Sequence, residues 1–175
     1  RLDGLGIRRV SELPVGVEEL SLSGNRLRSL GPLAGCAGLR ELCLAGNQLD
    51  EAAAVPLASL PSLRILDLSC NLLRDLEPLF LSDASRGPAF PRLEELDISA
   101  NLAVGDIAPA FAAPRLRVLA AAGLALASGR CRPRGSLERL DLRGCGLRRL
   151  EGLELLPGLR ELLLDGSAPP DLLAP

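Results

Sequence analysis

One pattern of apolar residues recurs seven times along this chain, and it constrains the fold more tightly than any other feature. Leu-like residues stand at positions 1, 4, 6 and 11 of most segments, and position 9 is often Asn. The exceptions are Ala103, a weak position-11 residue of the fourth segment, Ala121 at position 6 of the degenerate fifth and Pro169 at position 11 of the seventh. The seven segments begin at Val17, Leu39, Leu63, Leu93, Leu116, Leu137 and Leu159. A half-repeat with Leu5 at position 9 precedes them. Seven segments in the same phase predict a stack of similar structural units.

The spacing within a segment predicts one short strand followed by a sharp turn. Positions 4 and 6 alternate as inward-facing strand residues do, so each strand should pair in parallel with the strand of the next segment. Asn at position 9 lies at the turn, where its amide can bond backbone groups that would otherwise be buried without a partner. The expected ladder consists of Asn25, Asn47, Asn71 and Asn101. The ladder is interrupted at Leu124 and Ser167, which stand at position 9 of the fifth and seventh segments.

The residues between strands predict how the chain returns. Asn25 and Asn47 are 22 residues apart, and so are Cys145 and Ser167. Within both intervals apolar residues recur at every third position, a period that is typical of 3₁₀-helix. Short 3₁₀ segments are therefore expected on the side opposite the strands.

Two intervals are longer than the others. The interval that leads to Asn71 has 24 residues and contains an Ala-rich stretch, residues 51–54, which favours a longer helix. The interval that leads to Asn101 has 30 residues, and its Ser, Asp, Gly and Pro predict an inserted loop at residues 80–91. Phe80 and Phe90 should pin this loop to the core, whereas an exposed Phe would mark a second contact surface.

The pattern L-x-x-L-x-L-x-x-N-x-L is the leucine-rich-repeat signature, and the chain resembles that family over essentially its whole length. The resemblance implies an α/β leucine-rich-repeat solenoid of about seven and a half repeats, with residues 1–175 as a single domain. In this family the solenoid is a curved horseshoe, with a parallel concave sheet and 3₁₀ or short helical segments on the convex side. Cys145 is a common substitute for Asn at position 9. Because the chain opens partway through a repeat, we expect it to be an excerpt of a longer polypeptide.

The 22-residue intervals resemble the intracellular subclass that is typified by the regulatory subunit of protein phosphatase 1. Tubulin-folding cofactor and axonemal dynein light-chain repeats are similar. This resemblance implies a scaffold or regulator, either phosphatase-type or part of a cytoskeletal or ciliary assembly. The alternative is a regulatory repeat domain of a larger enzyme or receptor whose activity lies outside this chain.

Positions 3, 5 and 7 should point to the concave face, where solenoids bind partners. Of these 21 residues, eight are acidic and two are basic. The predicted partner-binding residues are Glu19, Glu41, Asp67, Glu95, Asp97, Val118, Arg139, Asp141, Arg143 and Glu161. An acidic concave face predicts binding of a basic segment of another protein. The alternative is a solvated face whose charge only maintains solubility.

Other features of this face have competing interpretations. Asp67 and Asp97 should be neighbours beside Glu95, and crowded carboxylates can serve a metal or acid–base chemistry, but the chain has no His or Lys to complete such a site. The fifth repeat places Val118, Ala120 and Ala122 on the face; this neutral patch either receives an apolar anchor or marks a decayed repeat.

Cysteine and arginine residues offer further candidate sites. Cys43 should be accessible and inert, because no His base is present and the neighbouring Glu19 and Glu41 are expected to raise the pKa of its thiol. The loop at residues 129–135, GRCRPRG, is either an exposed turn or a phosphate-binding segment. Other arginines lie just past the position-9 turn: Arg26, Arg28, Arg74, Arg148 and Arg149.

Composition excludes several function classes. A net charge of −2 gives no field to attract nucleic acid, and no apolar run is long enough to span a membrane. The five Cys form no CxxC pair and no terminal cluster, which favours a reducing, intracellular, cytoplasmic setting, with the cytoskeleton or cilium as candidate locations. No Walker loop, GxSxG or HExxH motif is present. We therefore expect a binding protein with no catalytic residues, cofactor or metal.

Overall fold

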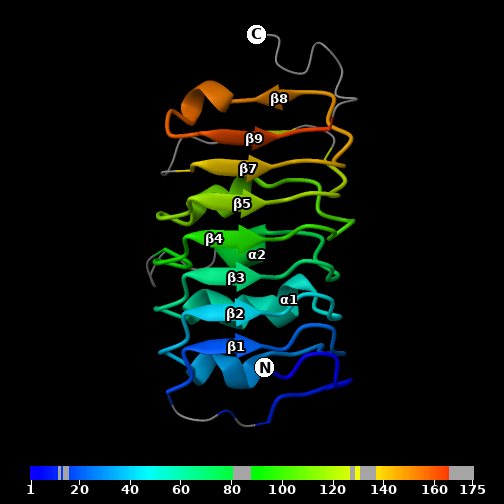
Figure 1. Ribbon diagram of the computed structural model, residues 1–175, viewed down its shortest axis with the longest axis vertical. Coiled ribbons are helices and arrows are strands. Elements are labelled where there is room, and N and C mark those ends of the chain that lie inside the picture. The colour runs from blue at the N-terminus through cyan, green and yellow to red at the C-terminus, as the bar shows by residue number, and fades with distance from the viewer. Residues whose placement is uncertain (12, 14–15, 81–87, 127–128, 131–136, 166–175) are drawn as a thin grey trace.

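A computed structural model describes residues 1–11, 13, 16–80, 88–126, 129–130 and 137–165 of the chain. Seven short strands stack in parallel, in chain order, into one sheet (Figure 1). They are β1 (Glu19–Ser21), β2 (Glu41–Cys43), β3 (Ile65–Asp67), β4 (Glu95–Asp97), β5 (Val118–Ala120), β7 (Arg139–Asp141) and β9 (Glu161–Leu163). Two further strands, β6 (Gly129–Arg130) and β8 (Leu150–Glu151), form a separate parallel pair. This architecture confirms the predicted leucine-rich-repeat solenoid.

The repeats are in register because each strand aligns the same repeat positions. Position 4 of one repeat pairs with position 4 of the next, as in Leu42 with Leu66 and Leu66 with Leu96. These residues point inward and are almost fully buried. The half-repeat joins the stack through backbone bonds, since Leu2 N donates to Ser21 O and Gly4 N donates to Ser23 O, both at 2.8 Å. The described repeats therefore form one continuous stack.

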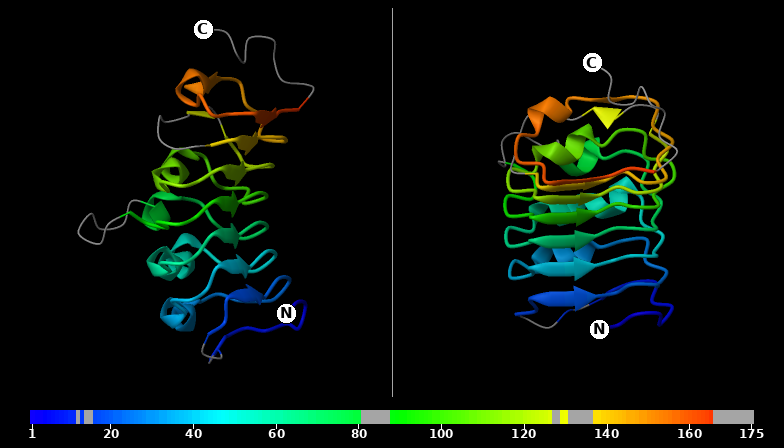
Figure 2. Two further views of the ribbon diagram at one scale, coloured as in Figure 1. Left: turned by 60° about the vertical axis from the view of Figure 1, so that its left-hand side comes forward. Right: turned by 45° about the horizontal axis from the view of Figure 1, so that its top comes forward.

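Short helices cover the side opposite the sheet (Figure 2). They are η1 (Gly31–Gly35), α1 (Glu51–Ala54), η2 (Val55–Ser59), α2 (Glu77–Phe80), η4 (Ala108–Ala112) and η5 (Leu153–Leu155). The 3₁₀ segments η1 and η5 lie where the three-residue period predicts them. The Ala-rich stretch forms α1, and Asp50 caps it by accepting a hydrogen bond from Ala53 N at 2.8 Å.

The core is a continuous column of leucines, and one position departs from the predicted pattern. Ala103 was the expected position-11 residue of the fourth repeat, but it is exposed, whereas Val104 is fully buried. The turn that follows Asn101 therefore takes one more residue before the chain re-enters the core. A β-branched side chain fills this space better than a methyl group does.

The aromatic residues that flank the inserted loop behave as predicted. Phe80 and Phe90 are 3% and 0% exposed, and their ring centroids lie 5.1 Å apart. They close the core between α2 and the fourth repeat, which confirms that they pin the ends of the loop. The loop itself, residues 81–87, lies outside the described residues.

The predicted Asn ladder is confirmed. Asn47 donates from Nδ2 to Leu22 O at 3.0 Å and to Leu44 O at 2.9 Å, and its Oδ1 accepts from Leu27 N at 3.0 Å. Asn25, Asn71 and Asn101 each donate to the equivalent carbonyl groups of their own layer and of the preceding layer, and all four members of the ladder are buried. Cys145 keeps the bond to the preceding layer, from Sγ to Ala121 O at 3.0 Å, and a longer contact from Sγ to Arg143 O at 3.7 Å. Ser167 lies outside the described part of the chain.

Candidate protein-binding surface

The concave face is built from three columns of side chains that run across the strands. The parallel register places Glu19 beside Glu41 at position 3 and Asp67 beside Asp97 at position 5. All ten residues predicted for partner binding stand on this face at strand positions 3, 5 or 7. The predicted neighbour relation between Asp67, Asp97 and Glu95 is confirmed by the pairing of β3 with β4.

The N-terminal part of this face, on β1 to β4, contains carboxylates that take part in no ion pair among the described residues. We call it the acidic half, and it consists of Glu19, Glu41, Asp67, Glu95 and Asp97. The three Glu are exposed and the two Asp are half-buried. A surface hollow of about 480 Å³ opens here, lined by Glu19, Glu41 and Asp67 around Ile65, with Arg1 and Asp3 among the other lining residues.

Hydrogen bonds orient Asp67 and Asp97, the two aspartates of the acidic half. Asp67 Oδ1 accepts from Ser69 N at 2.9 Å, and Asp97 Oδ1 accepts from Ser99 N at 2.8 Å. Asp3 continues this row, since it accepts hydrogen bonds from Ser21 Oγ and Ser23 N, and the bond from Ser21 lowers the pKa of Asp3. These bonds hold the carboxylates in place before a ligand arrives, which reduces the entropy lost on binding.

The C-terminal part of the face, on β7 and β9, has the opposite character. We call it the paired half, and it consists of Arg139, Asp141, Arg143 and Glu161. Arg143 Nη2 lies 2.6 Å from Asp141 Oδ2 and Arg143 Nε lies 2.9 Å from Asp141 Oδ1, a two-point contact that holds the pKa of Asp141 below its usual range. Arg139 Nε lies 3.3 Å from Glu161 Oε2. These four predicted binding residues therefore neutralise one another.

A neutral patch separates the two halves. Val118, Ala120 and Ala122 are half-buried on and just after β5, as the sequence predicts. The Ala122 backbone N–H donates to Ser99 Oγ at 3.2 Å. Behind this patch, position 9 is the buried Leu124, so the repeat has lost its ladder residue while keeping its strand.

Cys43 lies within the acidic half. Its Sγ lies 2.9 Å from Ser23 Oγ and donates to Asp67 Oδ2 at 3.2 Å. The pKa of the thiol is raised, as predicted, but the predicted cause was wrong: burial is the main cause and Asp67 adds to it, rather than Glu19 and Glu41. A thiol with a raised pKa is a poor nucleophile at neutral pH.

Sequence reasoning missed a ladder of ion pairs along one edge of the sheet. Position 2 of successive repeats carries charges of both signs, and these pair between layers. The pairs are Glu18 with Arg40 at 3.4 Å, Arg64 with Glu94 at 3.0 Å, Arg117 with Glu138 at 2.8 Å and Arg160 with Glu138 at 3.9 Å. Hydrogen bonds from Arg64 and Arg117 lower the pKa values of Glu94 and Glu138 respectively. The presence of both signs at position 2 of successive repeats was the available signal in the sequence.

The described residues hold no group of three or more His, Cys, Asp or Glu that could bind a metal ion. No described helix is long and apolar enough to cross a membrane. In the Arg-rich loop, residues 129–130 form β6, and residues 131–135 lie outside the described residues.

Comparison with known proteins agrees with the repeat architecture. A family model described as leucine-rich repeats (2 copies) matches residues 15–54 and 39–81. The crystal structure of an internalin C2 from Listeria monocytogenes aligns with 84% of this chain and 70% of its own, with a TM-score of 0.56 and 24% identity. The chain is a leucine-rich-repeat protein. At this identity the internalin supports the fold alone.

Curated relatives of this leucine-rich-repeat protein are longer chains. It is 36% identical over 124 residues to the transforming growth factor beta activator LRRC32 of Mus musculus, an alignment that covers 68% of this chain and 18% of the relative. It is 40% identical over 86 residues to the trophoblast glycoprotein of Macaca fascicularis, covering 46% and 20%. It is 39% identical over 110 residues to the podocan-like protein 1 of Homo sapiens, covering 60% and 20%. The chain thus spans about a fifth of each relative, and protein binding is the general function that this leucine-rich-repeat family supports.

Proposed function

We propose that this leucine-rich-repeat protein is an interaction module whose acidic half binds a basic segment of another protein. The observation that carries the proposal is the electrostatic contrast within one sheet: the paired half neutralises its charges, whereas Glu19, Glu41 and Glu95 on β1, β2 and β4 take part in no described ion pair. Unpaired charges of one sign on a preformed surface favour a ligand of the opposite sign.

The shape of the acidic half suits Arg or Lys side chains. Ile65 lies in the position-3 column between Glu41 and Glu95, so an apolar surface is bordered by carboxylates. A long basic side chain can pack its methylene stem on such a surface while its charged end reaches an acid. The strands are about 4.8 Å apart, so an extended segment crossing them would meet a new layer roughly every one to two residues.

The wider role of the module rests on the 22-residue intervals. Their resemblance to the intracellular subclass of the family supports a cytoplasmic scaffold or regulator, phosphatase-type or part of a cytoskeletal or ciliary assembly. The relatives support a second candidate, a regulatory repeat domain within a larger enzyme or receptor, because one of them bears the name of a growth factor activator and all are about five times longer than the matched region. Both candidates use the same acidic half.

The test compares two variants that change charge by the same amount. The first carries Glu95→Arg, Asp97→Arg and Asp67→Ser on the acidic half. The control carries Glu77→Arg, Glu154→Arg and Asp106→Ser, three exposed acids that lie away from the concave face. Parent and variants serve as bait in cell lysate, and bound proteins are identified by mass spectrometry.

The proposal expects proteins with basic segments that are retained by the parent and the control and lost by the acidic-half variant. Those segments, made as peptides, should then bind the parent directly. Retention of the same proteins by all three baits would show that the acidic half is only a solvated surface and would overturn the proposal.

A further inference from the structure

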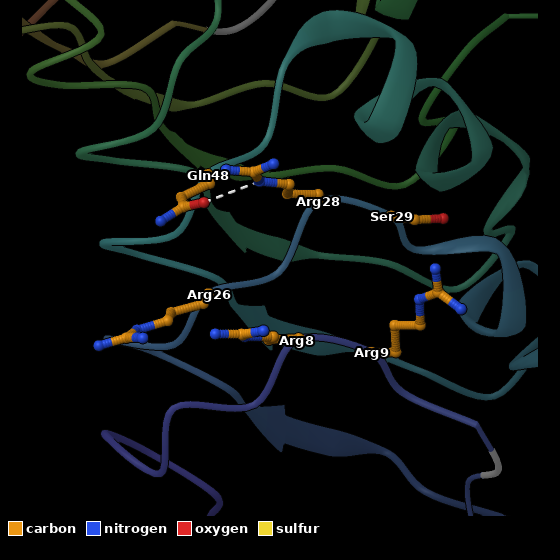
Figure 3. Close-up of a pocket in the computed structure, with 6 residues that line it drawn as sticks. All are labelled: Arg8, Arg9, Arg26, Arg28, Ser29 and Gln48. Carbon is orange, nitrogen blue, oxygen red and sulfur yellow. Dashed lines mark hydrogen bonds between the residues drawn. The ribbon is translucent and has the colours of Figure 1, made fainter.

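A second charged surface lies outside the concave face, on the flank just past the position-9 turns. Four arginines, Arg8, Arg9, Arg26 and Arg28, line a surface pocket of about 520 Å³ together with Ser29 and Gln48 (Figure 3). Arg8, Arg26 and Arg28 extend in one direction, and Arg9 extends from the other end of the pocket, below Ser29. None of the described residues that line it is acidic.

The repeat geometry gathers these arginines. Arg8 and Arg28 both stand at position 12, in the half-repeat and in the first repeat, so stacking places them one layer apart. Arg26 N donates to Ile7 O at 2.8 Å, which locks its layer onto the half-repeat. Arg28 Nε donates to Gln48 Oε1 at 2.8 Å, a bond that orients the guanidinium without neutralising it.

Two acids of the following layer, Asp50 and Glu51, accept hydrogen bonds from backbone N–H groups and form no ion pair with these arginines. Asp50 caps α1 through the Ala53 N–H, and Glu51 accepts a hydrogen bond from Arg74 N at 3.3 Å. Among the described residues, none of the four arginines forms an ion pair. The pocket therefore concentrates positive charge in a protein whose net charge is −2. Clustered guanidinium groups suit carboxylates and other oxyanions, which they can bind at two points.

The same flank continues into exposed apolar residues. At position 10, successive repeats carry Arg26, Gln48, Leu72 and Leu102. Backbone bonds from Gln48 N to Leu27 O and from Leu72 N to Leu49 O show that these residues follow one another layer by layer. Leu72 and Leu102 are 57% and 74% exposed. Apolar side chains this open next to a charged pocket indicate a protein ligand, because a polyanionic sugar or a free anion would gain nothing from them.

From these features we propose that the flank strip (Arg8, Arg9, Arg26, Arg28, Leu72 and Leu102) binds an extended segment of a partner protein with clustered acidic side chains followed by apolar ones. Layers about 4.8 Å apart place Leu72 and Leu102 roughly 10 to 14 Å beyond Arg26. An extended chain covers about 3.3 Å per residue, so the acidic and apolar groups of the partner should be about three to four residues apart. This surface is separate from the acidic half, and the two proposals can succeed or fail independently.

The probe is a fluorescein-labelled synthetic peptide in which four Glu are followed, after a short Gly-Ser spacer, by two Leu. The reversed sequence is tested beside it, because the flank strip does not fix the direction of the bound segment. Fluorescence anisotropy should show saturable binding of one of the two peptides. Replacing every Glu with Gln should weaken that binding by about tenfold or more, since the arginines would lose their charged partners.

Matched variants separate the flank strip from general electrostatics. Arg8→Glu with Arg26→Glu should lower the affinity for the peptide by about tenfold or more, and Leu72→Asn with Leu102→Asn should lower it by about three- to tenfold. The controls are Arg148→Glu with Arg149→Glu, which stand at the same repeat positions as Arg8 and Arg9, and Leu155→Asn, another exposed leucine. Both controls should bind like the parent. All these side chains are exposed, and thermal melts establish that each variant folds.

Three results would overturn this inference. Absence of binding by both peptides, or equal losses in the Arg148 and Arg149 control, would remove the evidence for a specific site. Unchanged binding after Leu72→Asn with Leu102→Asn, together with displacement by a heparin-derived oligosaccharide, would assign the pocket to a sulfated polysaccharide instead. Self-association in sedimentation experiments that is lost in Arg8→Glu with Arg26→Glu, without peptide binding, would make a second copy of the chain the occupant.

Discussion

The acidic half and the paired half of the concave face share one strand geometry but carry different charges at the same repeat positions. On β7 and β9 the sequence supplies both signs, so Arg143 binds Asp141 and Arg139 binds Glu161. On β1 to β4 the charged side chains at these positions are acids alone, and Glu19, Glu41 and Glu95 form no ion pair with a described residue. Surface ion pairs add little to stability, so the contrast concerns which half has charge available for a ligand.

The two halves also differ in what supports their turns, and breaking that support gives the largest expected effect. Asn47→Ala should lower the free energy of unfolding by about 2 kcal/mol, because Leu27 N would be buried without a partner and Leu22 O and Leu44 O would each lose one of two donated bonds. Cys145→Ala removes one thiol bond and should lower it by about 1 kcal/mol. Chemical denaturation monitored by circular dichroism measures both. Equal losses at the two positions would contradict the comparison.

Binding by the acidic half should depend strongly on ionic strength. The test uses a basic peptide identified by the lysate experiment. Raising the salt concentration from about 0.05 to 0.5 M should lower the affinity of the protein for this peptide by about tenfold, or about 1.4 kcal/mol, because salt screens exposed charges. The Glu95→Arg, Asp97→Arg, Asp67→Ser variant should show little dependence on salt in the same titration. Salt-independent binding by the parent would place the contact on apolar surface, with the Val118 patch as the next region to test.

The ion pair of the paired half should be visible in the dependence of stability on pH. Because Arg143 lowers the pKa of Asp141 in the folded state, the pair contributes stability above the unfolded pKa of about 3.9 and loses it as pH falls toward the folded pKa. Arg143→Ala should therefore lower the stability modestly at pH 7 and by progressively less as the pH falls below about 4. Urea unfolding at several pH values tests this, with Arg148→Ala as a control that removes an exposed arginine far from Asp141.

The smallest expected effect concerns the backbone at position 8, which requires a left-handed conformation in both halves. Gly144 has φ +71° in the paired half, and Ala100 adopts φ +56° in the acidic half. Ala100→Gly should raise the free energy of unfolding by about 0.5 kcal/mol, since relief of a strain of roughly 1 kcal/mol is partly offset by the greater freedom of Gly in the unfolded chain. Gly144→Ala should have the opposite effect. Thermal melts resolve both changes, and destabilisation by Ala100→Gly would show that the Ala100 side chain contributes packing.

The repeat pattern allowed the strands, their register and the Asn ladder to be predicted because these depend on a fixed period. Each inward Leu and each position-9 Asn has the same neighbours one repeat away, so one correct alignment places them all. The prediction was wrong at Ala103, just after the longest interval ends, where the turn takes one more residue before Val104 enters the core. Periodicity carries no information where the period itself changes.

The charge balance of the concave face was harder to predict, because it depends on which side chains reach one another. Asp141 and Arg143 are two residues apart and point to the same side of the strand, so their pairing could have been expected from the alternation of strand residues. The cause of the raised pKa of Cys43 could not have been predicted from the sequence, because burial of the thiol by neighbouring repeats is a property of the folded stack. The flank pocket likewise needs Arg8 and Arg9 to stack beside Arg26 and Arg28, which becomes apparent only when the half-repeat is placed in the solenoid.

The linear order of strands in the sheet has a mechanical consequence. Each strand pairs only with the strands of the repeats before and after it, so a force applied along the stack is carried by one interface at a time. Such a molecule yields by peeling, repeat after repeat, rather than by failing as a whole. Each 22-residue turn that peels away releases on the order of 75 Å of extended chain. A partner bound across several repeats would hold them together, so that the protein would resist extension instead of lengthening one repeat at a time.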